Sequence, residues 1–146
     1  MMFETLLITN IFATAFMTGL IWFVQIVHYP GFHQLDSTNF TALHRFHIPR
    51  TGFVVIPPMI AELGSSIWLI TAYNQLWIYN AVGLAIVIAI WISTFALQTQ
   101  FHRKLKKSPN KQLITGLVTT NWIRTLLWTA KMGLGIYILT ILITSP

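Results

Sequence analysis

Apolar and polar positions alternate along the chain in long blocks. Four apolar blocks, residues 3–27, 51–73, 76–98 and 119–144, each reach the roughly 20 residues that a helix needs to cross a bilayer. They predict an all-α fold: an integral membrane four-helix bundle that forms a single transmembrane domain over residues 1–146. The first block lacks a basic start and a small-residue cleavage site, so we expect a retained helix rather than a signal peptide.

Polar residues inside the four blocks recur at the spacing of one helix face, about 100° per residue. A polar group without a partner in lipid is costly, so four polar faces indicate four inward faces and a polar bundle interior. For the Ser and Thr residues, hydrogen bonds between helices are a sufficient explanation. In chain order, the four stripes consist of Asn10, Thr14, Thr18, Gln25 and His28; Thr51, Glu62, Ser65, Ser66 and Tyr73; Asn80, Trp91, Thr94, Gln98 and His102; and Asn121, Arg124, Trp128, Lys131 and Gly135.

Two charged residues lie deep in the predicted helices. Glu62 and Lys131 each follow the start of their block by about 18 Å, at about 1.5 Å of rise per residue, and so reach a similar depth. Because an unpaired charge there costs at least ~3 kcal/mol, we expect Glu62 to pair with Lys131, with Arg124 as a further donor. A structural salt bridge and a catalytic group are both open interpretations. In the catalytic one, Glu62 or His28 is the general base, and Lys131 with Arg124 stabilises an oxyanion.

Charge is scarce and unevenly placed. Only 8% of the residues are charged, and the formal net charge is +6. Most Lys and Arg residues fall in the first and third connections between spans, which predicts that these connections are cytoplasmic and that both termini lie outside. A basic loop also suits anionic lipid headgroups, whereas no motif favours nucleic acid. The basic residues of the two connections are Arg45, Arg50, Arg103, Lys104, Lys106, Lys107 and Lys111.

The first connection has a helical pattern of its own. Asp36 or Ser37 can cap a short helix that Pro49 ends, and Arg45 falls on its outer face. We therefore expect a short amphipathic helix that lies in the membrane interface between the first two spans. Its inward stripe consists of Phe40, Leu43, His44 and His47.

Four of the five histidines gather at one end of the predicted bundle. His44 and His47 have the i, i+3 spacing that lets two imidazoles reach one metal, so with His28 or His102 they predict a site for zinc, copper or mononuclear iron. The alternative is that they only bond headgroups or backbone carbonyls. With three acidic residues and no cysteine, carboxylate-bridged di-iron and thiolate sites are excluded. Haem would need two facing histidines, and only His28 with His102 comes close.

Several short motifs follow one another in a familiar order. They are QIVHYPGF after the first span, PP in the second, a polar end to the third, and NWIRTLLW at the start of the fourth. This layout resembles the small four-helix bacterial membrane proteins related to fungal anthrone oxygenases. The resemblance implies a protein of the bacterial inner membrane that oxygenates an apolar aromatic without a tightly bound cofactor. It also implies that His28, Pro30, Trp122 and Arg124 match the family's motif residues.

Two functions from different classes remain open. One is an oxidoreductase or oxygenase that acts on a lipophilic aromatic or quinone-like molecule entering from the bilayer. The other is a non-enzymatic protein for ligand binding, transport or an accessory role, because no catalytic signature is present. A ridge formed by Ala81, Ala85 and Ala89 could support a homo-oligomer. The residues expected to line a ligand or cofactor pocket are Gln25, Trp91, Gln98, Trp122 and Trp128.

Overall fold

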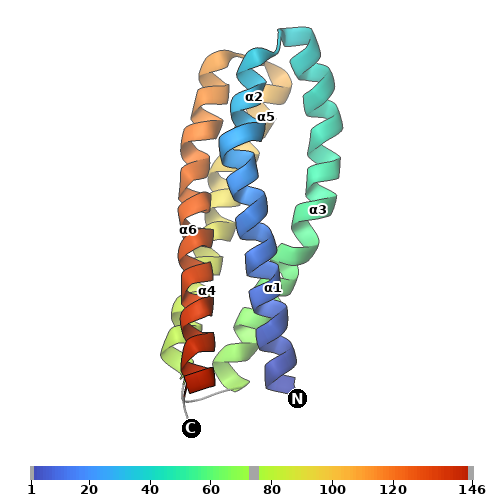
Figure 1. The fold of residues 1–146 in the computed structure, drawn as a ribbon. Coiled ribbons are helices and arrows are strands. Elements are labelled where there is room, and N and C mark those ends of the chain that lie inside the picture. The colour runs from blue at the N-terminus through green and yellow to red at the C-terminus, as the bar shows by residue number, and fades with distance from the viewer. Residues whose placement is uncertain (1, 73–75, 145–146) are drawn as a thin grey trace.

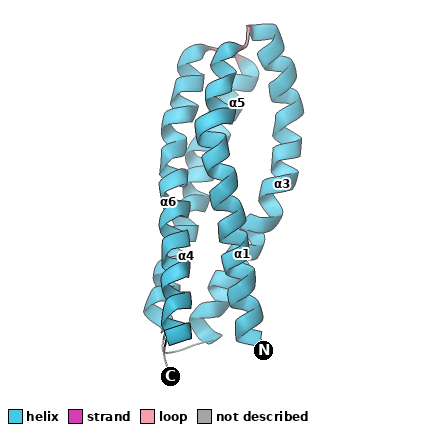
Figure 2. Cartoon of the chain, in the orientation of Figure 1, coloured by secondary structure: helices cyan, strands magenta, loops and turns pink. Residues whose placement is uncertain are grey.

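The computed structural model describes residues 2–72 and 76–144 and contains no strand within them. The first rod runs through α1 (Met2–Phe23), η1 (Val24–His28), α2 (Tyr29–Gly31) and η2 (Phe32–Gln34). The second rod is the single helix α3 (Ser37–Ala72). The third rod joins α4 (Trp77–Ser93), η4 (Thr94–Gln98) and α5 (Thr99–Lys107), and the fourth is α6 (Lys111–Thr144). The rods lie side by side as an elongated bundle (Figures 1 and 2).

Four helical stretches of the described chain are long and apolar enough to cross a membrane, namely Glu4–Gln34, Ser37–Thr71, Trp77–Lys107 and Lys111–Thr144. This confirms the predicted number of long helices, although each extends beyond its predicted block at one end. The largest apolar side chains on the outside, such as Phe53 at 82% and Phe12 at 72% exposure, form a surface that lipid would cover.

The predicted separate helix in the interface is wrong. Residues 37–72 form one continuous helix, with Pro49, Pro57 and Pro58 inside it. Proline removes one backbone donor, and in this turn the Arg50 guanidinium donates to the Phe46 carbonyl oxygen over 3.4 Å and lies over the Phe46 ring. Three of the four residues of the predicted inward stripe, Phe40, His44 and His47, are buried. The fourth, Leu43, is exposed, so its predicted inward position is wrong.

The bundle has two different ends. The start of α1 and the end of α6 lie together at one end of the bundle, and the two short turns before α3 and α6 lie at the other end (Figure 1). Asp36 caps α3 by accepting hydrogen bonds from the backbone N–H groups of Thr38 and Asn39, and Asn110 caps α6 through the N–H of Leu113. We also expect a tight hairpin at residues 73–76, between the second and third spans, but residues 73–75 lie outside the described residues.

Two π-helical turns interrupt the rods at the end that carries the histidines. η1 contains Gln25 and His28, and η4 contains Thr94 and Gln98. A π turn adds one residue to the helical period, which rotates the following side chains, and such turns recur at functional sites. Beyond the two π turns, Tyr29 is buried and His102 lines a pocket.

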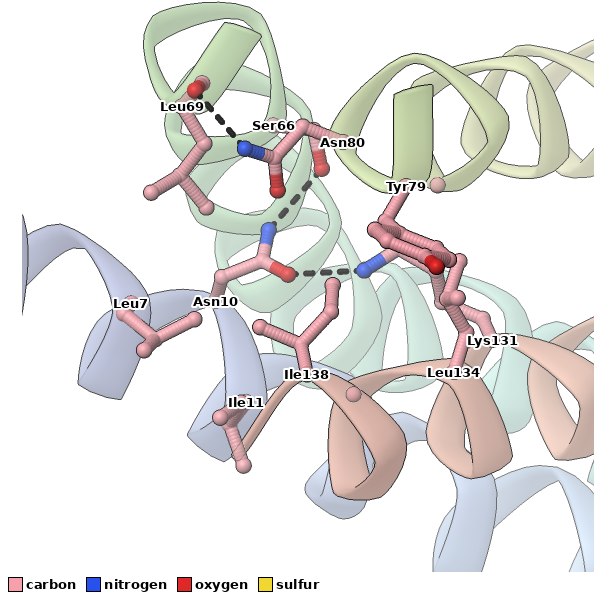
Figure 3. Close-up of a pocket in the computed structure, with 12 residues that line it drawn as sticks. Leu7, Asn10, Ile11, Ser66, Leu69, Tyr79, Asn80, Lys131, Leu134 and Ile138 are labelled. Carbon is pink, nitrogen blue, oxygen red and sulfur yellow. Dashed lines mark hydrogen bonds between the residues drawn. The ribbon is translucent and has the colours of Figure 1, made fainter. Parts of the chain in front are cut away.

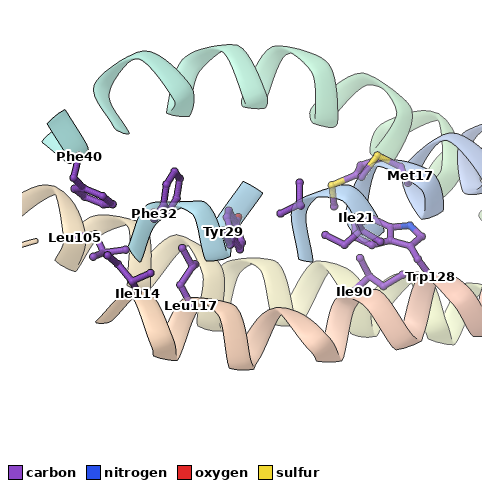
Figure 4. Close-up of a cluster of buried hydrophobic side chains, with 12 residues drawn as sticks. Met17, Ile21, Tyr29, Phe32, Phe40, Ile90, Leu105, Ile114, Leu117 and Trp128 are labelled. Atoms are coloured by element: carbon purple, nitrogen blue, oxygen red, sulfur yellow. The ribbon is translucent and has the colours of Figure 1, made fainter. Parts of the chain in front are cut away.

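The main apolar cluster lies between the middle of the bundle and its histidine end (Figure 4). Its buried members include Phe32, Leu117 and Trp128, each at most 1% exposed. A second cluster around Leu7, Leu69, Leu76 and Ile138 fills the opposite end. The polar faces predicted from the helical period are turned inward beside these clusters, which confirms the polar interior.

Candidate functional site

The first polar region is a closed cluster centred on Asn10, which we call the Asn10 cluster (Figure 3). The Asn10 amide nitrogen donates to the Ser65 and Ser66 hydroxyls over 2.9 and 2.8 Å and to the Glu62 backbone oxygen over 3.1 Å. Its side-chain oxygen accepts a 2.7 Å bond from Lys131 Nζ. One amide therefore joins α1, α3 and α6.

The Glu62 carboxylate belongs to the same cluster. It accepts a 2.6 Å hydrogen bond from Thr14 Oγ1 and a 3.0 Å bond from Trp128 Nε1. The predicted direct pairing with Lys131 is wrong, since no ion pair within 4.0 Å joins them in the described structure. Asn10 stands between the two, and the Glu62 charge still acts on Lys131 through space.

The Asn10 cluster leaves little room for anything else. The cavity beside Lys131 has a volume of about 10 Å³, which is close to the ~10–15 Å³ that one water requires. Gly83 makes this close packing possible, because a Cβ there would lie 3.3 Å from Lys131 Cε. The cluster is therefore an enclosed hydrogen-bonded network rather than a ligand pocket.

The second polar region is a cavity of about 640 Å³ between α3 and the η4–α5 segment, which we call the lateral pocket. Apolar side chains of both elements form its walls, and exposed members such as Ile56 (52%) and Phe95 (57%) carry it to the outer surface of the bundle. Its polar lining consists of Tyr29, His44, His47, Thr51, Thr94, Gln98, Thr99, His102, Arg103, Lys106 and Arg124.

The histidines form a hydrogen-bonded network at the inner wall of this pocket. His28 Nε2 lies 2.9 Å from His47 Nδ1, and His44 Nε2 lies 3.1 Å from His102 Nδ1. His102 Nε2 is also 3.0 Å from the Tyr29 hydroxyl. The pairs are linked by ring contacts, with the His47 and His102 ring centroids 6.0 Å apart. The prediction that four histidines gather at one end is confirmed.

These histidines do not fit a metal in the arrangement seen. In the part of the chain that the structure describes, no group of three or more His, Asp or Glu side chains converges on a point that could hold an ion. The ring nitrogens of His44 and His102 that face each other already share a hydrogen bond, as do those of His28 and His47. A metal would have to replace these bonds, so metal binding stays a prediction.

Arg124 forms part of the floor of the lateral pocket and is only 6% exposed. Its Nη1 donates to the Asn121 side-chain oxygen over 3.1 Å, and its guanidinium carbon lies 5.2 Å from the Trp128 ring centroid. Its Nε is buried without a hydrogen-bond partner, and so are Trp91 Nε1 and Gln98 Oε1. All three residues line the same pocket, and buried polar groups of this kind are ordinarily satisfied.

The remaining predicted site residues lie elsewhere. Gln25 accepts a 2.9 Å bond from the Asn121 amide, behind the pocket floor. Trp128 is fully buried between Glu62 and Arg124. Trp122 is 38% exposed and packs edge to face on Trp22, away from both polar regions. The structure thus brings Trp91, Gln98, Arg124 and three of the four predicted metal ligands together, and leaves Glu62 and Lys131 in the separate Asn10 cluster.

Some pocket residues escaped the sequence analysis. Tyr29 was missed although it follows Gln25 by four residues and so lies near the predicted polar stripe; its place directly after His28 drew attention to the histidine instead. Val55 and Met59 are ordinary apolar residues of a predicted span, and nothing in the pattern distinguishes them from residues that pack on a neighbouring helix. The adjacent prolines at 57 and 58 were the available signal for looser packing of α3 in this region.

The fold and the site define an all-helical bundle with four potential membrane-crossing helices and a lateral pocket lined by histidines. No protein-family model, no curated protein and no solved structure matches this chain.

Proposed function

We propose that the protein is a multi-pass membrane protein that binds a lipophilic aromatic or quinone-like molecule in the lateral pocket. The observation that carries the proposal is the 640 Å³ cavity itself, with apolar walls that reach the bundle surface and a polar inner end. Ligand pockets for small molecules have volumes of about 300–1,000 Å³ and combine apolar walls with a few convergent polar groups. A molecule dissolved in the bilayer would reach this pocket without passing through water.

The orientation in the membrane is part of this proposal. The histidine end and the basic turn around Ser108 lie at the same end of the bundle, opposite the chain ends, and we place that end in the cytoplasm of a bacterial inner membrane. Ser108→Cys should then react with an impermeant thiol reagent only in inverted vesicles, and Asn74→Cys only in intact cells. Labelling of Ser108→Cys in intact cells would reverse the orientation.

Binding is tested by filling the pocket. Gly52 lines it, and a Cβ there would make only an ordinary contact with Ile56 at 3.8 Å, so Gly52→Leu should fold with a smaller pocket. Gly64→Leu is the matched control, because Gly64 is an exposed position of the same helix with open space around it. In phosphatidylcholine nanodiscs, the neutral probe 9-anthracenemethanol should bind about tenfold more weakly to Gly52→Leu and unchanged to Gly64→Leu. Equal binding to all three proteins would contradict the proposal.

A second candidate function is an oxygenase, favoured by the Tyr29–His102–His44 hydrogen bonds at the pocket wall. A neutral histidine there can take a proton from an activated CH₂ group of an aromatic ketone. The carbanion would add dioxygen, and the hydroperoxide would lose water, so that one oxygen atom remains as a carbonyl. Anthrone and ¹⁸O₂ should then give labelled quinone faster with the wild type than with His102→Phe. Identical rates in both proteins and in empty nanodiscs would remove this candidate.

A further inference from the structure

The buried charges of the described chain do not balance. The charged side chains among its buried residues are Glu62, Arg124 and Lys131, at 1%, 6% and 5% exposure. The charge of Glu62 acts on Lys131 in the Asn10 cluster. The other two acidic residues of the sequence are both exposed: Glu4 lies in the first turn of α1, and Asp36 directly precedes α3. Arg124 is thus left with no acidic side chain within 4.0 Å in the described chain.

The surroundings of Arg124 only partly replace a counterion. Asn121 accepts one of its hydrogen bonds, the Tyr29 hydroxyl interacts with the guanidinium, and the Trp128 ring provides a cation–π contact. Each of these neutral groups interacts more weakly with a guanidinium than an anion does in a poorly solvated site, where an unpaired charge is costly. The Nε–H of Arg124 has no acceptor at all. Within the described residues, this cation therefore has neutral neighbours and no acidic side chain at ion-pair distance.

Two of the other three unpartnered atoms belong to residues of the same pocket. Trp91 Nε1 is a buried donor and Gln98 Oε1 is a buried acceptor, and both residues line the pocket, whereas Ser93, the residue of the remaining atom, does not line it. Gln98 is held in place through its amide nitrogen, which donates to the Thr120 hydroxyl over 3.0 Å. An oxyanion can accept from Arg124 and Trp91, and a neighbouring hydroxyl on the same ligand can donate to Gln98.

We propose that the lateral pocket selects a lipophilic anion, whose oxyanion binds Arg124 and whose apolar body lies between α3 and the η4–α5 segment. This inference rests on the proposed binding function and specifies the chemical class of its ligand. A carboxylate or phenolate on an aromatic body and the phosphate of an anionic lipid share this chemistry. Neutral molecules of the same shape occupy the pocket more weakly.

The test compares two probes with one ring system, 9-anthracenecarboxylate and the neutral 9-anthracenemethanol, in phosphatidylcholine nanodiscs. A hydrogen bond between charged groups is worth enough to make the carboxylate bind about 10- to 100-fold more tightly to the wild type. Arg124→Gln should abolish this preference and retain the neutral probe, and Arg124→Lys should keep part of it, because the charge remains without the planar fork. Thermal unfolding of each variant identifies any that fails to fold.

The outcomes separate the two proposals. If both probes bind the wild type equally and Gly52→Leu weakens both, the pocket binds ligands but the inference about charge is wrong. If neither probe responds to Gly52→Leu, the binding function itself is wrong. A preference for the carboxylate that survives Arg124→Gln would also overturn the inference. Replacing half of the phosphatidylcholine by phosphatidylglycerol distinguishes an anionic lipid from a free lipophilic anion as the ligand. If a lipid phosphate occupies the pocket, the carboxylate probe should bind about tenfold or more weakly in the mixed nanodiscs. If the ligand is a free lipophilic anion, the carboxylate probe should keep its affinity.

Discussion

The Asn10 cluster and the lateral pocket both bury charged side chains among the same helices, but the two regions differ in whether the chain supplies partners for those charges. In the Asn10 cluster, the Glu62 carboxylate accepts from Thr14 and Trp128, and Lys131 donates to Asn10, which also bonds the Glu62 backbone oxygen. The adjoining cavity has a volume of only about 10 Å³. In the lateral pocket, Arg124 lacks an acidic partner among the described residues, and the cavity measures about 640 Å³. Polar groups that find hydrogen-bond partners within the chain hold the helices together. Buried polar groups that lack such partners beside a large cavity can bind a ligand.

The largest effect is expected from breaking the Asn10 cluster. Glu62→Gln leaves the Lys131 charge without its nearby carboxylate and places an amide opposite the Trp128 N–H donor. Removal of one member of a directly paired buried ion pair costs about 3–5 kcal/mol in soluble cores. Because Glu62 and Lys131 are not in direct contact, we expect a loss near the lower end of this range in unfolding by denaturing detergent.

The double variant Glu62→Gln with Lys131→Met separates structure from function. It removes both charges, so it should recover most of the lost stability and bind 9-anthracenecarboxylate with nearly wild-type affinity. A double variant that is stable but has lost probe binding would return Glu62 and Lys131 to the functional site.

The two buried cations give the next comparison. Lys131→Met should cost about 3 kcal/mol or more, because it leaves the Glu62 carboxylate buried beside no cation. Arg124→Met should cost less than about 1 kcal/mol, since the lost bond to Asn121 is offset by the removal of an unpaired charge. Both are measured by the same detergent unfolding assay. Equal losses would mean that Arg124, like Lys131, maintains the fold.

A smaller effect is expected where α4 packs on Lys131. Gly83→Ala places a methyl group 3.3 Å from Lys131 Cε, and the overpacking costs about 1–3 kcal/mol. Alanine favours the helix by about 1 kcal/mol at this position too, so we expect a small net loss of stability. Gly133→Ala is the control, because a Cβ there meets nothing within 4 Å and alanine favours the helix by about 1 kcal/mol. Thermal unfolding should therefore move in opposite directions. A rise of the unfolding temperature in both variants would show that the side chains around Lys131 leave room for a methyl group at Gly83.

The smallest effect concerns the cap of α3. Hydrogen bonds from Asn39, through its backbone and side chain, hold the pKa of the Asp36 carboxyl below its usual range. A lowered folded-state pKa means that the contribution is present above the unfolded pKa, near 3.9, and is lost as pH falls through the folded value. Asp36→Asn keeps a capping side chain without the titration. The stability difference between wild type and variant should narrow below about pH 4, and a difference that stays constant there would exclude this linkage.

The sequence predicted the interior of the bundle better than its details. The helical period placed Asn10, Glu62, Gln98 and Lys131 on inward faces, because a half-buried helix repeats its polar side every turn. It could not show that Asn10 stands between Glu62 and Lys131, since depth along two helices does not determine which third helix lies between them. Trp122 was assigned to the pocket through a motif, although its position two residues before Arg124 already turns it outward.

Local breaks in helical regularity were the other source of error. Pro49 predicted a helix end, but the inward packing of Phe40, His44 and His47 keeps α3 continuous through it. Neither π turn leaves a pattern in hydrophobicity, so the sequence predicted uninterrupted helices at residues 24–28 and 94–98. Pocket walls depend on the course of α3 relative to α4, which is a property of tertiary packing.

The most direct measurement is the anomalous diffraction of crystals soaked with 10-bromo-9-anthracenecarboxylate. The account predicts one strong bromine peak between α3 and the η4–α5 segment, with the carboxylate within hydrogen-bonding distance of Arg124. A bromine peak at the Asn10 cluster, or a probe in the lateral pocket with its carboxylate turned away from Arg124, would contradict it.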